Sequence, residues 1–205
     1  PLPLADARAL IAGVVGPKPL PESVVRELIE RTGGVPLFVE AVTRTILETG
    51  VLRELDDRYE LHGPLPPGLI PDTVHDSLMA RIDRLGADKS VAQLASVIGR
   101  QFGFELLQQV SGRSSAALKL VLGRLLQLDL IDAADASAAP AYAFKHALIQ
   151  DAAYESLLRA TRQEIHRKIA ETLIALFPDT TAARPDLVAQ HFSKAGLGAQ
   201  ALKYW

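Results

Sequence analysis

Apolar residues recur at helical spacing through most of this chain. In residues 1–16 and 20–34 they return every three or four positions, which predicts one short amphipathic helix in each segment. A glycine pair that includes Gly34 then provides a helix stop, and Pro36 stands where the first turn of a new helix, over residues 36–50, tolerates a proline. The stretch RTGGVPLFVE therefore predicts a corner between two helices.

An alternating stretch and a proline-rich stretch follow. The alternation in residues 51–63 predicts a small hairpin about Asp56 and Asp57, adjacent carboxylates of the kind that form turns. Residues 63–71 are the densest proline and glycine stretch of the chain. We therefore place the first domain boundary, and a hinge, in residues 63–71.

From residue 72 the helices come in quick succession and give way to two strands. The pattern predicts four helices and then two strands, over residues 72–85, 88–99, 104–110, 114–129, 130–135 and 142–146. The small-residue loop ASAAPA joins the strands, and Ser111, Gly112 and Arg113 supply a tight turn before the last of the helices. Three consecutive helices followed by a two-stranded ribbon, as in residues 88–146, form the winged-helix arrangement.

Further amphipathic helices complete the chain. Two are predicted over residues 146–158 and 161–177, and Pro178 ends the second. Residues 184–196 and 198–205 are typical of a stacked helical array, in which each pair of helices needs the next pair to bury its apolar face. The predicted fold class is mainly α, with a helical bundle, a winged-helix domain with a small β-wing, and the entry to a tetratricopeptide-like array.

Composition excludes several classes of protein. The 205 residues carry a formal net charge of −2, so no global field steers the chain toward nucleic acid or anionic lipid. The chain has no cysteine, which excludes disulfides, thiolate metal sites and cysteine nucleophiles. No apolar run approaches the ~18 residues that span a bilayer. We expect a soluble, cytoplasmic protein without a membrane partner. We also expect an excised piece, because the sequence starts at Pro1 without a methionine and stops at Trp205 within an apolar helical pattern.

Six segments occur in an order that is known from one family. They are GGVPLFVEAV, IPDTVHDSLMARIDRL, ASVIGRQF, YAFKHALIQDAAYESLL, RQEIHRKIA and LVAQHFSKAG. Together they resemble the region downstream of the ATP-binding core in bacterial signal-transduction ATPases. Such regions occur in adenylate and guanylate cyclase family proteins with an attached ATPase module, and in large transcriptional regulators with a related ATPase. The resemblance covers nearly the whole chain.

The resemblance implies three parts and a regulatory role. Residues 1–68 resemble the helical lid of an ATPase module, residues 69–158 a winged-helix domain, and residues 159–205 a helical linker and the start of a repeat array. No glycine-rich phosphate loop and no cyclase domain is present in the sequence, so we expect a non-catalytic fragment without a cofactor of its own. ATP or ADP is implied for the intact protein. The implied partners are the nucleotide-binding core and repeat domains of the same chain, and other proteins.

The resemblance also implies three residues that contact nucleotide. It places Pro36 at one wall of an adenine pocket, with Gly34 permitting close approach, since proline offers a flat apolar surface and no backbone donor. It places His146 near the diphosphate of ADP, where an imidazole can donate to a phosphate oxygen. From the residues alone, the alternatives are a plain helix corner and an ordinary histidine at a helix start.

Basic side chains gather on two predicted helices. We interpret the larger group as a solvated helix face, with an interface to another domain as the alternative; it comprises Arg159, Arg162, His166, Arg167 and Lys168. Arg81 and Arg84 receive the same interpretation. Of these two, Arg81 is the better candidate to reach an acidic partner across the lid boundary.

A winged helix also raises the possibility of DNA binding. Between Ser114 and Leu130 the only bases are Lys119 and Arg124, and the wing ADASAAPA has none, so we expect no nucleic-acid partner. A helix apolar on nearly all sides is predicted to be buried against protein. The leading hypothesis is a relay in which lid and winged helix rotate together when nucleotide changes. The alternatives are a DNA-binding domain of a transcriptional regulator and a purely structural spacer.

Overall fold

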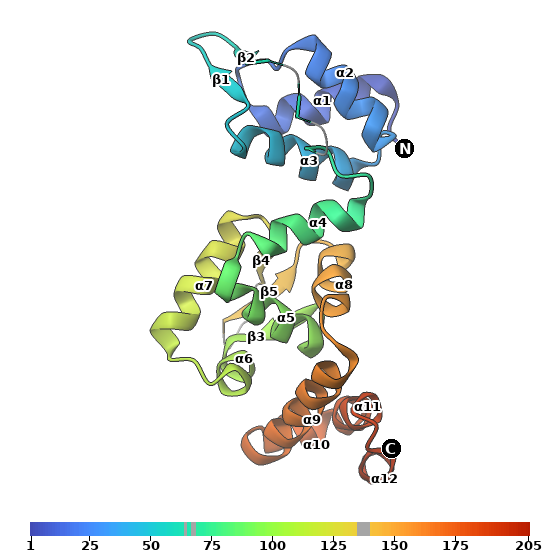
Figure 1. Ribbon diagram of the computed structural model, residues 1–205. Coiled ribbons are helices and arrows are strands. Elements are labelled where there is room, and N and C mark those ends of the chain that lie inside the picture. Colours follow the sequence, from blue (N-terminus) through green and yellow to red (C-terminus); the bar gives the residue numbers. More distant parts are fainter. Residues whose placement is uncertain (64, 67–68, 135–139) are drawn as a thin grey trace. The chain divides into compact units, whose positions relative to one another are not determined.

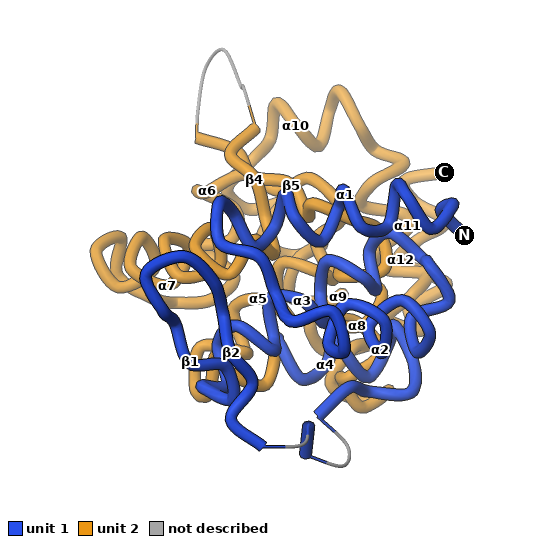
Figure 2. Tube along the Cα trace, turned by 90° about the horizontal axis from the view of Figure 1, so that it is seen from above, with its two compact units in different colours: residues 1–81 blue, residues 82–205 orange. Residues whose placement is uncertain are grey.

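The computed structural model describes residues 1–63, 65–66, 69–134 and 140–205, and these are mainly helical with small antiparallel sheets (Figure 1). The chain divides into two compact units, Pro1–Arg81 and Ile82–Trp205, coloured separately in Figure 2. The boundary falls inside α4 (Val74–Asp83). The division into lid, winged helix and repeat entry stays a prediction.

Three helices build the first unit, as the sequence predicts. They are α1 (Leu4–Val15), α2 (Glu22–Thr32) and α3 (Pro36–Glu48). Helix α3 packs against both of the others. Their apolar stripes meet in one core because residues three and four apart share a helix face; the buried members are Ile11, Val24, Val25, Leu28, Phe38, Val39, Val42, Ile46 and Ile70.

The predicted hairpin is confirmed. Strand β1 (Leu52–Glu54) pairs antiparallel with β2 (Tyr59–Leu61), and Leu52 lies opposite Leu61. The Leu55 N–H donates to the Arg58 carbonyl over 2.8 Å and closes the turn, so the two aspartates between them are turn residues.

The predicted hinge lies partly outside the described residues, because residues 64, 67 and 68 fall within it. Helix α4 follows, and Thr73 stands just before it as a cap. The Asp76 N–H donates to the Thr73 hydroxyl oxygen over 3.0 Å, and that hydroxyl donates to the Asp76 carboxylate over 2.7 Å. This reciprocal cap explains why the helix starts so soon after a proline-rich stretch.

A helix, strand, helix, helix, strand, strand order opens the second unit. After the 3-10 turn η1 (Gly86–Asp88) come α5, β3, α6, α7, β4 and β5, over Lys89–Ile98, Gln101–Gly103, Phe104–Ser111, Ser115–Gln127, Ile131–Ala134 and Ala141–Phe144. The sheet is antiparallel, with the order β3-β5-β4. Strand β3 was not predicted. Most of the predicted wing loop, residues 136–141, lies outside the described residues.

The predicted turn between α6 and α7 is confirmed. Gly112 adopts a left-handed conformation with φ of 68° and ends α6. Ser114 caps α7, because its hydroxyl oxygen accepts the Ala117 N–H over 3.3 Å. A serine hydroxyl accepts a backbone N–H at the start of a helix, and a glycine readily adopts the left-handed conformation that ends one.

The rest of the unit is helical. It comprises α8 (Ala147–Glu155), α9 (Arg159–Leu176), α10 (Pro178–Ala183), α11 (Pro185–Lys194) and α12 (Gly198–Ala201). Helix α10 was not predicted, and α12 is shorter than expected. The core that joins these helices to α5 and α6 includes Val97, Val110, Leu157, Ile169, Ala170, Leu173, Val188 and Phe192. No helix in the described part of the chain is long and apolar enough to cross a bilayer.

Candidate functional sites

Gly34 permits a close approach, and the partner in this structure is the chain itself. Its φ is +69°, and a Cβ built there would lie 2.9 Å from the Leu2 carbonyl oxygen. The Leu2 N–H donates to the Gly34 carbonyl over 2.7 Å. The missing side chain is thus explained by the segment that precedes α1, and contact with an adenine stays a prediction.

Pro36 begins α3 and is exposed. Val35 is the N-cap, and its carbonyl accepts the N–H groups of Phe38 and Val39 over 3.0 Å and 2.9 Å. Val35 itself is 37% exposed, so the corner presents two adjacent apolar side chains at the surface of the first unit. A proline ring is apolar and has no backbone donor, and contact of Pro36 with an adenine stays a prediction.

His146 is the N-cap of α8, in the second unit, and is exposed. Its Nδ1 accepts the Leu148 N–H over 3.3 Å. A neutral imidazole that accepts at Nδ1 carries its proton on Nε2, so the ring holds a donor on its outer side. Gly34 and Pro36 therefore share one corner of the first unit, whereas His146 belongs to the other unit.

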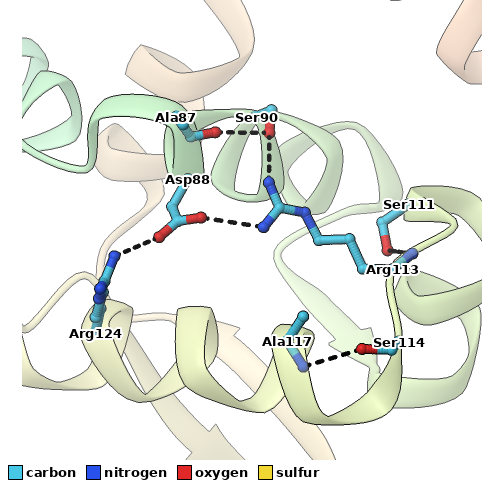
Figure 3. Close-up of polar contacts among 8 residues, drawn as sticks. All are labelled: Ala87, Asp88, Ser90, Ser111, Arg113, Ser114, Ala117 and Arg124. Carbon is cyan, nitrogen blue, oxygen red and sulfur yellow. Dashed lines mark hydrogen bonds and ion pairs between the residues drawn. The ribbon is translucent and has the colours of Figure 1, made fainter.

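A half-buried carboxylate links the start of α5 to the turn before α7 and to α7 itself (Figure 3). Asp88, whose side chain is 15% exposed, accepts from Arg113 Nη1 over 3.0 Å and from Arg124 Nη1 over 2.7 Å. Figure 3 shows the two guanidinium groups reaching the carboxylate from different elements. This contact ties the helix-turn-helix corner together.

The bases of α7 are consequently occupied within the unit. Arg124 is held by Asp88, and Lys119 Nζ lies 5.9 Å from the centre of the Phe104 ring. The prediction that α7 is buried on nearly all sides is wrong on one face, because Leu120 is 72% exposed. The buried face consists of Leu118, Val121, Leu122 and Leu125.

Two histidines and a tyrosine form a buried polar cluster that sequence reasoning missed. His166 Nδ1 lies 2.8 Å from His191 Nδ1, and His166 Nε2 lies 3.1 Å from the Tyr154 hydroxyl. His166 is 1% exposed and His191 4%. No three His, Asp or Glu side chains within the described ranges gather as metal ligands.

The environment of the histidine pair opposes its protonation. Burial lowers the pKa of His166 to about 3, with further lowering from the charges of His191, Lys194 and Arg162. Burial also lowers the pKa of His191 to about 4, and the Lys194 charge adds to that effect. Both rings are therefore neutral at pH 7, and one Nδ1–H donates to the other Nδ1.

Two interpretations of basic residues need correction. His166 does not belong to a solvated face, since it is buried on the stripe that continues with Ile169 and Leu173. That spacing, three and seven residues, was the sequence signal for its burial. Arg81 is likewise buried, with 6% of its surface exposed. In the larger basic group, Arg162 is half-buried, whereas Arg159, Arg167 and Lys168 are exposed.

Comparison with known proteins adds one relative and no family. No family model matches the chain. An uncharacterized protein of Rhizobium meliloti (strain 1021) is 28% identical over 177 residues, which make up 83% of this chain and 16% of that protein. The chain thus spans less than a fifth of the length of the relative it matches.

Proposed function

We propose that this chain is a non-catalytic regulatory region of a multidomain signalling ATPase in the cytoplasm. It relays the nucleotide state of an ATP-binding core to output and repeat domains of the same protein. The order of helices and strands in the second unit supports a winged-helix assignment, because the strand after the first helix pairs with the last strand of the ribbon. The relative's much greater length agrees with a multidomain parent.

The observation that carries the proposal is the geometry of His146. Its Nδ1 is engaged by a backbone N–H, so the remaining Nε2–H is a donor at the surface of the unit. A donor held by a helix cap can contact a phosphate oxygen of ADP without rearranging. Pro36 is exposed at the start of α3, in the first unit, and this exposure supports its proposed role as an adenine wall.

The last helices support the proposed repeat entry. Helices α9 and α11 pack on each other, and α12 follows α11. Leu202 is 76% exposed next to α12, which is the kind of apolar surface that a further helix covers in a stacked array. In the proposed relay, this array receives the movement of the winged helix.

His146 can be tested in the intact protein by comparing two replacements. His146→Ser retains a cap for α8 and lacks the imidazole donor, whereas His146→Ala loses both. A hydrogen bond to a charged group contributes about 1.5–3 kcal/mol, so we expect both variants to bind ADP roughly 10- to 100-fold more weakly. Only the alanine variant should speed hydrogen exchange in α8.

The control is His62→Ser, which replaces an exposed histidine of the first unit. It should bind ADP as the wild type does. ADP binding that is unchanged in His146→Ser would show that the histidine is a helix cap only, and the proposed contact would be withdrawn.

The second candidate function is DNA binding, which the helix and strand order of the second unit favours. Against it stand the engagement of Arg124 by Asp88 and of Lys119 by Phe104. A winged helix that reads DNA needs free bases on its third helix and wing. Duplex DNA titrated at rising salt distinguishes the candidates: we expect no binding, whereas affinity that falls steeply with salt supports the DNA-binding reading.

A further inference from the structure

A basic cleft lies between α9 and the end of α11, and it shares no residue with the predicted nucleotide contacts. Its volume is about 390 Å³. The side chains that matter for its chemistry are Tyr154, Arg159, Arg162, Gln163, Ser193 and Lys194. Three of these six are cations, and no aspartate or glutamate of the described chain lines the cleft.

The three cations have no carboxylate partner. Arg159, Arg162 and Lys194 form no ion pair within the part of the chain that the structure describes, although other bases nearby do. Arg167, on the same helix, pairs with Glu164 over 2.5 Å, and Arg184 pairs with Asp186 over 2.8 Å. The cleft therefore collects positive charge that no carboxylate of the described chain balances.

The side chains are positioned by two helices that pack firmly. Arg159 and Arg162 are three residues apart and share a face of α9, while Lys194 ends α11. The Arg162 guanidinium lies 5.0 Å from the centre of the Tyr154 ring. Its Nε is buried and has no hydrogen-bond partner in the described chain. Arg162 is thus held in place before any ligand arrives.

The same charges act on the buried histidine pair. Lys194 and Arg162 both add to the lowering of the pKa of His166, after burial and the effect of His191. No anionic side chain of the described chain lines the cleft to offset these two charges.

We propose that this cleft binds the phosphate group of a small phosphorylated molecule. A phosphate carries up to two negative charges and several acceptor oxygens, and it suits converging guanidinium and ammonium donors better than a single carboxylate does. The Gln163 amide and the Ser193 hydroxyl supply neutral donors at the same cleft. The proposal is independent of the nucleotide contacts proposed above.

The test is calorimetric titration of the chain with inorganic phosphate, pyrophosphate and ADP, with sulfate as the comparison anion. Arg159→Gln with Lys194→Gln removes two exposed charges from the cleft, and Lys168→Gln with Lys203→Gln removes two exposed charges elsewhere in the second unit. Far-UV circular dichroism checks that both double variants fold. We expect saturable phosphate or pyrophosphate binding that weakens at least 10-fold in the cleft variant and less than twofold in the control.

The titrations with pyrophosphate and ADP distinguish a nucleotide from other molecules that carry a phosphate group. Binding of pyrophosphate and ADP with similar affinity supports recognition of the phosphates alone, and preference for ADP with the same loss in the cleft variant supports a nucleotide. Equal weakening in the two double variants would show a response to overall charge and overturn the proposal. So would sulfate binding as tight as phosphate binding, or no binding of any of the anions.

Discussion

At the residue scale, Gly34 shows how one backbone position fixes a corner. Its positive φ disfavours any residue with a side chain, and the Leu2 carbonyl leaves no room for a Cβ. Gly33, its neighbour, also has a positive φ of +57°, yet nothing lies within 4 Å of its absent Cβ. A comparison of the two glycines therefore separates the effect of backbone strain from the effect of crowding by Leu2.

Replacing each glycine by alanine should cost different amounts of stability. Gly33→Ala places a side chain in the left-handed conformation, which should lower the free energy of unfolding by about 1 kcal/mol. Gly34→Ala has the same effect and must also displace Leu2, so we expect a loss of about 2–3 kcal/mol in all. Hydrogen exchange of the α3 amides reports the stability of the first unit. Equal exchange rates in the two variants would mean that crowding by Leu2 does not add to the loss of stability.

The histidine pair makes the second unit sensitive to acid. The pKa values of His166 and His191 in the folded state, about 3 and about 4, lie below the ordinary value of 6.5. The unfolded chain therefore takes up protons first. Stability is complete above pH 6.5 and is lost as pH falls toward 4, by about 2 kcal/mol per histidine between pH 7 and pH 5.

Urea denaturation at pH 7 and pH 5, followed by far-UV circular dichroism, measures this loss. Leucine at both positions, His166→Leu with His191→Leu, should remove most of the difference between the two pH values. His62→Gln, a change at an exposed histidine, should leave it intact. A difference that persists in the double leucine variant would assign the acid sensitivity to other groups.

Histidine burial shows where residue-level prediction fails. The spacing of His166 to Ile169 and Leu173 placed it on the apolar stripe of α9, yet its neighbours Arg167 and Lys168 favoured a solvated interpretation. What stabilises a buried imidazole is its partners, Tyr154 and His191. His191 is 25 residues away in sequence, and no local pattern indicates that the two rings meet.

At the element scale, patterns that are local in sequence were predictable. Helices α1 to α3 follow from apolar spacing, and the β1–β2 turn follows from its two aspartates. Strand β3 was missed because its three residues carry no alternation of their own; it forms by pairing with β5, some forty residues later. Helix α10 was missed because Pro178, which ends α9, also begins the next helix.

Asp88 connects the start of α5, the turn before α7 and α7 itself, so its replacement should destabilise all three. Asp88→Asn leaves Arg113 and Arg124 close together without a counter-charge, and we expect a loss of about 1–2 kcal/mol of unfolding free energy. Asp83→Asn removes a carboxylate that is 58% exposed and pairs with Lys89, so it should cost at most about 0.5 kcal/mol. Thermal denaturation at low salt compares them; equal midpoints would show that the Asp88 contact is only a surface pair.

At the scale of the whole molecule, the residues predicted to contact nucleotide are distributed over the two units. Gly34 and Pro36 belong to the first unit and His146 to the second. The proline-rich residues 63–71 lie between these residues in sequence. In the proposed relay, this stretch is the hinge.

The central claim is that Pro36 and His146 contact nucleotide, and that they do so only in the intact ATPase. It is tested by calorimetric titration of ADP and ATP into this chain and into a version extended N-terminally through an ATP-binding core, each with Pro36→Ala, His146→Ser and the control Pro178→Ala. We predict that the extended protein binds ADP, and that Pro36→Ala and His146→Ser weaken binding while Pro178→Ala does not. Failure of the extended protein to bind nucleotide, or affinity unchanged by all three substitutions, would contradict the account.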